Sequence, residues 1–183
     1  IAYILIKGIP NISPSLFEWN YTSTNVSIMP ALISTLFTIL LTLLITLPIG
    51  IFTAIYLSNY AKNKTFIKLV RFATEILSSI PSIVYGLFGY LFFVAKTNHG
   101  LGMGYSLIAG CLTVAIMILP TIIRTTEEAI LTVNPLQAHA SLALGATKIQ
   151  TIFKVVIPEA MDGILGGIFL STGRIVGESA ALI

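Results

Sequence analysis

The longest uncharged stretch of the sequence strongly limits what the chain can fold into. Residues 19–61 contain no Asp, Glu, Lys or Arg, and residues 28–57 within them are almost continuously apolar. A helix needs about 20 apolar residues to cross a bilayer core of about 30 Å. We therefore predict a membrane span over residues 28–57 that is tilted or extends past the bilayer. Pro48 can kink this span, and neighbouring helices allow such a kink in lipid.

The composition indicates that this span is one of several. Hydrophobic residue types make up 56% of the 183 residues and charged types 9%, and the mean hydropathy is +0.96. A soluble domain carries about 25% charged residues, so an ordinary soluble enzyme, a disordered chain and a disulfide scaffold are excluded. We predict an all-α, polytopic membrane protein with three further spans, over residues 71–95, 103–123 and 159–183.

The basic residues predict the orientation of these spans. Seven of the ten Lys and Arg residues lie between the first and second predicted spans, at the first residue of the second (Arg71), or in the connection after the third. All three places are on one side of the membrane, and an excess of Lys and Arg marks the cytoplasmic side. Membrane topology thus explains the net charge of +3, and no nucleic-acid partner is expected. Residues 8–27 and 96–105 are expected on the external side.

The two ends of the sequence indicate a longer protein. The chain starts without Met, with apolar residues 1–6 that are too few to cross a bilayer. It stops at Ile183 within an apolar run. We therefore expect a fragment that lacks an N-terminal span and the sequence after Ile183.

Residues 124–158 connect the third and fourth predicted spans and carry helix signals of their own. Asn134 can cap a helix, and Pro135 suits the first helical position. Gly145 can take the positive φ with which many helices end. We predict two short helices on either side of this glycine, over residues 136–144 and 147–156. Such an elbow can dock in the groove of a partner protein, although the residues alone favour a structured connection and no more.

This elbow resembles the EAA motif of ABC-importer permeases. That motif reads Glu-Ala-Ala, three residues, Gly, nine residues and Ile-x-Leu-Pro. The corresponding positions have the same spacing in this chain: His139, Ala140, Ser141, Gly145, Val155, Ile157 and Pro158. His139 replaces the Glu, Ser141 replaces the second Ala, and Pro158 is expected to end the second helix. The resemblance implies that five of these residues couple the chain to a separate ATPase: His139, Ala140, Ser141, Gly145 and Pro158.

Three further segments are similar to the permeases of phosphate importers. Residues 79–89 read SIPSIVYGLFG, residues 118–129 read ILPTIIRTTEEA and residues 173–180 read GRIVGESA. The second segment looks like the PstA family more than its partner family PstC. Together with the elbow, these segments identify the chain as resembling the PstA permeases from about Met29 to its end.

This resemblance implies a type I ABC-importer transmembrane domain (MetI-like), of which the chain lacks most of the first span and the sixth. It implies a permease subunit in the plasma or inner membrane that moves inorganic phosphate together with a PstC-like permease. The other implied partners are a PstB-like ATPase dimer, which uses ATP and Mg, and an external PstS-like phosphate-binding protein. No cofactor and no enzymatic activity are expected on this chain, because it has neither a P-loop sequence nor an evident catalytic set.

The fourth predicted span contains two charged residues, Arg174 and Glu178, at positions i and i+4 of one helical face. A charge at the bilayer centre costs about 2.5–3.5 kcal/mol, so both are expected to face protein or a water-filled path. In one interpretation they neutralise each other and fix helix packing. In the other, the planar Arg174 guanidinium contacts phosphate in transit while Glu178 competes for it. The residues leave both open, and the resemblance favours the substrate path.

Several other residues have interpretations that need no substrate. Two pairs of glycines at i and i+4 are expected to let helices pack closely: Gly163 with Gly167, and Gly173 with Gly177. Glu127 and Glu128 are expected to form a solvated face or to pair with Arg124 or Lys148. Arg71 is expected to anchor a span at the cytoplasmic interface. No metal site is expected, since no second His or Cys lies near His139 in the sequence.

Two alternatives to a phosphate importer stay open. The first is an ABC permease for another oxyanion, such as molybdate or sulfate, which would share the elbow. The second is a secondary transporter or channel driven by an ion gradient, which would need neither the elbow nor an ATPase.

Overall fold

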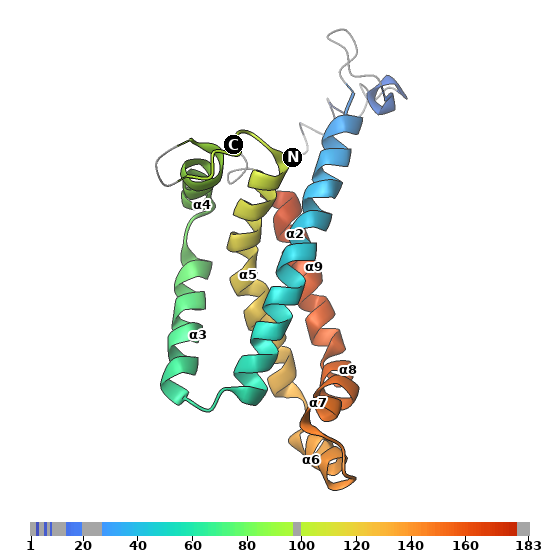
Figure 1. The fold of residues 1–183 in the computed structure, drawn as a ribbon. Helices are drawn as coiled ribbons and strands as arrows, with labels where there is room; N and C mark the ends of the chain where they lie inside the picture. Colours follow the sequence, from blue (N-terminus) through green and yellow to red (C-terminus); the bar gives the residue numbers. More distant parts are fainter. Residues whose placement is uncertain are drawn as a thin grey trace. The chain divides into compact units, whose positions relative to one another are not determined.

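The computed structural model of the chain describes residues 3, 6, 8, 14–19, 27–96 and 100–178. In this part of the chain every regular element is helical, which confirms the all-α prediction (Figure 1). The chain divides into two units, residues 1–38 and 39–183. The expectations for the two chain ends and most of those for residues 8–27 lie outside the described residues.

The first unit contains one 3₁₀ turn, η2 (Pro14–Phe17), and the start of helix α2 (Met29–Ile55). The carbonyl of Leu16 accepts a hydrogen bond from the backbone N–H of Ile28 at 2.8 Å. This bond connects the turn to the residue before the helix. The second unit contains the rest of α2, all later helices and every predicted site residue that is described.

Helix α2 covers the first predicted span. It continues as a π-helical turn, η3 (Tyr56–Tyr60), so the helical run has 32 residues, and Pro48 does not interrupt it. Several of its hydroxyl groups donate to carbonyls of the helix itself, as Thr46 Oγ1 does to the Thr42 carbonyl at 2.8 Å. The hydroxyl of Thr42 is buried and has no hydrogen-bond partner among the described residues. Gly50 allows α2 to approach the next long apolar helix, since a Cβ at this position would lie 2.6 Å from Ile122 Cγ2.

The second predicted span, 71–95, does not form a single straight helix. Helix α3 (Lys64–Ser79) ends within this range. Helix α4 (Ser82–Gly89) begins after a bend of 96° and is extended by the π-helical turn η4 (Tyr90–Val94). The cause is Pro81, because a proline has no N–H for the helix and forces the residue before it out of the helical region. Ile80 accordingly has an extended backbone, with ψ at 131°.

Helix α5 (Leu107–Thr132) is the central element of the second unit and contacts α3, α4 and the last helix. Its first turn is capped by Ser106, whose Oγ accepts from the N–H of Ala109 at 3.3 Å. The helix passes the predicted boundary at residue 123 by nine residues. That boundary is the predicted end of the membrane span, where charges begin, and the helix continues beyond it because residues 124–132 include no Gly or Pro that would end a helix.

The elbow follows α5 and consists of short helices. Helix α6 (Pro135–Ala143) is capped by Asn134, whose side chain accepts from the N–H of Leu136 at 3.0 Å, and Gly145 has φ at +88°. These features confirm the first predicted helix and the reversal. The second half comprises α7 (Lys148–Thr151), the π-helical turn η5 (Ile152–Val156) and α8 (Ile157–Glu159).

Pro158 does not end the second half of the elbow, contrary to the prediction. The chain stays helical through Pro158, which lies in the first turn of α8. The missing N–H of a proline costs least in a first turn. Helix α9 (Met161–Gly177) follows after Ala160 and covers part of the fourth predicted span, whose residues 179–183 lie outside the described part.

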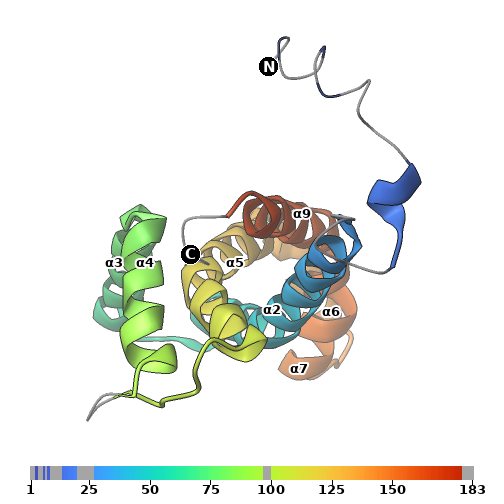
Figure 2. The same ribbon diagram turned by 90° about the horizontal axis from the view of Figure 1, so that it is seen from above.

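Helix α9 lies along α5, and Figures 1 and 2 show the two helices side by side. A Cβ at Gly167 would lie 2.3 Å from Thr125 Oγ1, and one at Gly163 would lie 2.6 Å from the Ala129 Cβ. These two glycines therefore allow the close packing that was predicted for them. Gly173 and Gly177 have no atom within 4 Å of such a Cβ, so the packing role predicted for them has no counterpart in the described residues.

Two neighbouring glycines of α9 provide a test of this packing. We expect Gly167→Ala to destabilise the protein by about 1–3 kcal/mol, since the short Thr125 side chain cannot move away from the added methyl group. The matched control is Gly166→Ala, because nothing lies within 4 Å of a Cβ there. The control should be stabilising by up to about 1 kcal/mol, the difference in helix propensity. Unfolding midpoints of the two variants in detergent would check the opposite signs, and equal midpoints would contradict the packing.

The described residues of the second unit form two apolar cores. One surrounds the middle of α5 and includes Val114, Met117 and Ile118, all fully buried. The other lies at the base of the elbow and includes Ile130, Ile152 and Ile164, which come from α5, η5 and α9. This second core makes the elbow continuous with the two long helices that enter and leave it.

Candidate functional site

The predicted site residue Arg174 lies in the last turn of α9 and is half-buried against α5. Its Nη1 donates a long hydrogen bond of 3.4 Å to Thr121 Oγ1. A guanidinium has five N–H donors, and in the described residues this is the one hydrogen bond that Arg174 makes. The partial negative charge at a helix C-terminus favours a cation at this position. Within the described part of the chain, most of the Arg174 donors therefore have no hydrogen-bond partner.

Glu178 is not on the same helical face as Arg174, and this prediction is wrong. Helix α9 ends at Gly177, and Glu178 has an extended backbone with φ at −88° and ψ at 93°. No ion pair joins Arg174 and Glu178 in the described residues. The predicted neutralising pair is therefore not formed.

Five charged side chains gather between α3 and α5 around a pocket of about 260 Å³ that Leu131 also lines: Arg71, Glu75, Arg124, Glu127 and Glu128. Arg71 donates from Nη2 and Nε to a single oxygen of Glu127, Oε1, at 2.6 and 3.0 Å. Arg124 Nε lies 3.1 Å from Glu128 Oε1, and its Nη1 lies 3.9 Å from Glu75 Oε2. The group has three carboxylates and two guanidinium groups, so it is a poor site for an anion.

Glu127 is the residue of this group that sequence reasoning placed wrongly. Its side chain is 7% exposed and pairs with Arg71, neither solvated nor paired with Arg124 or Lys148. Helical spacing could have indicated that Glu127 is buried, since it lies on one helical face with Ile123 and Ile130, which are both buried. Its partner lies 56 residues earlier, on another helix, and no local pattern identifies such a partner.

The structure brings the two halves of the elbow together through side chains. Ser141, which stands at the second Ala position of the motif, has its Oγ 3.0 Å from Oγ1 of the buried Thr151. Gln137 Nε2 donates to Glu159 Oε1 at 3.4 Å. These bonds connect α6 to α7 and α8 and make the elbow a defined unit. His139, Ala140, Gly145 and Pro158 are exposed on it.

The outer surface of the elbow carries large apolar side chains. Leu144 is 90% exposed, and Figure 1 shows α6 and α7 beyond the ends of α5 and α9. Four more exposed apolar side chains lie on the elbow: Leu136, Leu142, Ile149 and Phe153. An exposed apolar group of this kind marks an interaction site.

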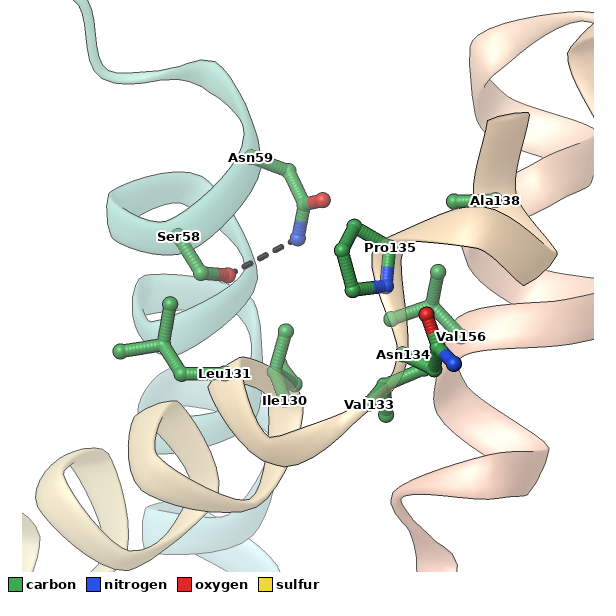
Figure 3. Close-up of a pocket in the computed structure, with 9 residues that line it drawn as sticks. All are labelled: Ser58, Asn59, Ile130, Leu131, Val133, Asn134, Pro135, Ala138 and Val156. Carbon is green, nitrogen blue, oxygen red and sulfur yellow. Dashed lines mark hydrogen bonds between the residues drawn. The ribbon is translucent and has the colours of Figure 1, made fainter.

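A second pocket, of about 230 Å³, lies between the end of α2 and the hinge where α5 passes into α6 (Figure 3). Ser58 and Asn59 line it on the α2 side, and Asn59 Nδ2 donates to Ser58 Oγ at 2.8 Å. Asn134 and Pro135 line it at the hinge. The hinge of the elbow thus has space beside it. No group of three or more His, Cys, Asp or Glu side chains that could hold a metal ion occurs among the described residues.

Comparison with known proteins gives a family. The model of the family described as "Binding-protein-dependent transport system inner membrane component" matches residues 46–183. Among curated relatives, the phosphate transport system permease protein PstA of Haemophilus influenzae is 35% identical over 182 residues, which is 98% of this chain and 63% of that protein. The PstA homolog of Mycoplasma genitalium is 38% identical over 185 residues, 98% of this chain and 28% of the relative.

A third relative has a less specific name. The probable ABC transporter permease protein YqgI of Bacillus subtilis is 44% identical over 124 residues, which is 68% of this chain and 41% of that protein. The chain thus spans less than two thirds of the length of each of these three relatives.

Proposed function

Because the chain belongs to the family of binding-protein-dependent transport system inner membrane components, we propose that it is the permease subunit of an ATP-driven importer of inorganic phosphate. It is a multi-pass membrane protein, with two helices long and apolar enough to cross a bilayer and a third such unit if α3 and α4 count as one bent span. Relatives that are named phosphate permeases support the choice of cargo. The partners we propose are a second permease subunit, a separate ATPase dimer and an external phosphate-binding protein.

The elbow is the observation that carries this proposal. It presents exposed apolar side chains, and its base shares a core with α5 and α9. Docking of the ATPase on α6 and α7 would place the force of ATP-driven closure on a unit that is continuous with both long helices. If ATP binding favours one position of the elbow, it also favours one access state of the permease. The contact residues we propose are His139, Ala140, Ser141, Gly145 and Pro158.

Arg174 and Glu178 are the residues we propose for the substrate path. The available donors of Arg174 support this role, since a planar guanidinium fits two phosphate oxygens at once. Its bond to Thr121 is long, so a phosphate oxygen can compete with it. Glu178 lies at the end of the same helix, where its negative charge would limit how tightly phosphate is held.

A glycine substitution tests the coupling role of the elbow. Gly145 has φ at +88° and open space around it, so Gly145→Val leaves the packing alone and strains the backbone by about 1–3 kcal/mol. We expect ATP-dependent phosphate uptake to fall at least about tenfold while the protein still inserts and ATP is still hydrolysed. Uptake into vesicles that contain the full-length protein and its partners measures this.

The chain offers a matched control for this substitution. Gly104 also has a positive φ, +67°, and no atom within 4 Å of an added Cβ, and it lies before α5, far from the elbow in the sequence. Gly104→Val should therefore leave uptake near the wild-type level. Normal uptake in Gly145→Val, or an equal loss in both variants, would count against the elbow as the coupling element.

A further inference from the structure

The second half of the elbow is tied to the end of α2 by one lysine. Lys148, the first residue of α7, donates a hydrogen bond from Nζ to the backbone carbonyl of Asn59. Asn59 belongs to η3, the last turn of the helical run that starts with α2. The last carbonyls of a helix have no partner within it and carry partial negative charge, so a cation binds them well. Lys148 thus caps a helix that is 89 residues away in the sequence.

The same ammonium group makes a second contact. Lys148 Nζ lies over the ring of Tyr60 at 4.4 Å from its centroid. This distance is within the range of a cation–π interaction, in which the negative face of the ring attracts the cation. The Lys148 side chain therefore contacts both the backbone and an aromatic ring at the end of the α2 run, and together these two contacts fix its position and orientation.

The other contacts between the elbow and the end of α2 show why the bond from Lys148 matters. Ile55 of α2 shares an apolar core with Ile152 and Val156 of the elbow, and such apolar packing is not directional. Beside it, the pocket of about 230 Å³ leaves the hinge of the elbow incompletely packed against Ser58 and Asn59 (Figure 3). In the described residues, the bond from Lys148 is the one hydrogen bond between the elbow and the α2 run.

We propose that Lys148 and Tyr60 position the end of α2 on the elbow and pass elbow movement to α2. This inference rests on the proposed coupling role of the elbow. Helices α5 and α9 are joined to the elbow by the chain itself, so they follow it directly. Helix α2 has no such connection, and its apolar contact with the elbow can slide. We call the contacts of Lys148 with Asn59 and Tyr60 the lysine clamp. The clamp makes α2 move with the elbow, so that α2, α5 and α9 change position together.

Four substitutions test the clamp in the full-length complex, with phosphate transported per ATP hydrolysed as the readout. Lys148→Met keeps the aliphatic stem and removes the cation, and Tyr60→Leu removes the aromatic face. We expect Lys148→Met to lower the ratio at least about fivefold, and Tyr60→Leu to lower it less. Lys148→Arg and Tyr60→Phe keep a cation and a ring, and both should restore most of the ratio.

Lys154→Met is the matched control, because Lys154 is an exposed lysine of the same elbow with no ion pair or hydrogen bond in the described residues. It should leave the ratio unchanged. A wild-type ratio in Lys148→Met, or the same loss in Lys154→Met, overturns the clamp. If the Lys148→Met complex fails to assemble, the two Tyr60 variants test the clamp instead. Equal ratios of phosphate to ATP for Tyr60→Leu and Tyr60→Phe would overturn the clamp. Absence of ATP-dependent uptake in the wild-type complex would instead contradict the proposed function.

Discussion

Replacement of Arg71 by alanine is expected to destabilise the protein by about 3 kcal/mol, because it leaves the carboxylate of Glu127 buried without a counter-charge. The effect is placed at the lower end of the range for buried ion pairs, since the Arg71 side chain is 47% exposed while that of Glu127 is 7% exposed. Both hydrogen bonds of the pair join α3 to α5, so the two helices should also separate more easily. Unfolding of the purified protein in detergent measures the change.

Two comparisons make this result specific. Arg124→Ala should cost less than about 1 kcal/mol, because its partners Glu75 and Glu128 have side chains that are 71% and 63% exposed. The double variant Arg71→Met with Glu127→Leu should recover most of the loss, since no charge remains buried. Equal effects of Arg71→Ala and Arg124→Ala would show that the pair between α3 and α5 is not what stabilises this region.

Replacement of Arg174 by alanine is expected to reduce phosphate uptake about 100-fold or more while the complex still assembles. Loss of two hydrogen bonds from a charged donor is worth about 3 kcal/mol, which corresponds to about a hundredfold in an equilibrium constant. Among the described residues Arg174 makes one long hydrogen bond, to Thr121, so its removal should cost little in packing. Uptake and co-purification of the partner subunits would be measured on the same preparation.

Thr121 supplies the control for Arg174. Thr121→Val removes the hydroxyl that accepts from Arg174 and leaves the guanidinium in place, so uptake should fall by less than about tenfold. Arg174→Lys should lie between wild type and Arg174→Ala, because an ammonium keeps the charge without the planar fork. Loss of assembly in Arg174→Ala would favour a packing role over contact with phosphate.

The elements that could be predicted from the sequence are those with local causes. The apolar run of α2, the cap at Asn134 and the reversal at Gly145 each depend on residues next to one another, and the structure contains all three. The bend at Pro81 also had a local signal, but the prediction for residues 71–95 followed hydropathy, which does not register a single proline. The predicted membrane span over residues 103–123 ends where charges begin, whereas α5 continues to Thr132, because charged residues can continue a helix beyond the membrane.

The parts of the site that could not be predicted depend on contacts between distant segments. The pairing of Glu127 with Arg71 and of Lys148 with Asn59 joins residues 56 and 89 positions apart. A single sequence does not show which residues so far apart in the chain come into contact in the fold. The prediction that Glu178 shares a helical face with Arg174 was wrong for a different reason. The i, i+4 rule assumes that the helix continues, and α9 ends at Gly177.

The most direct test of the proposed function is uptake of labelled phosphate into vesicles that contain the full-length protein, the second permease subunit, the ATPase and the external binding protein. ATP would be supplied or withheld, and excess molybdate or sulfate would be added as competitor. We predict uptake that requires ATP and resists both competitors. Uptake that runs without ATP would contradict the ABC permease and favour a secondary transporter or channel, and uptake displaced by either competitor would contradict phosphate as the cargo.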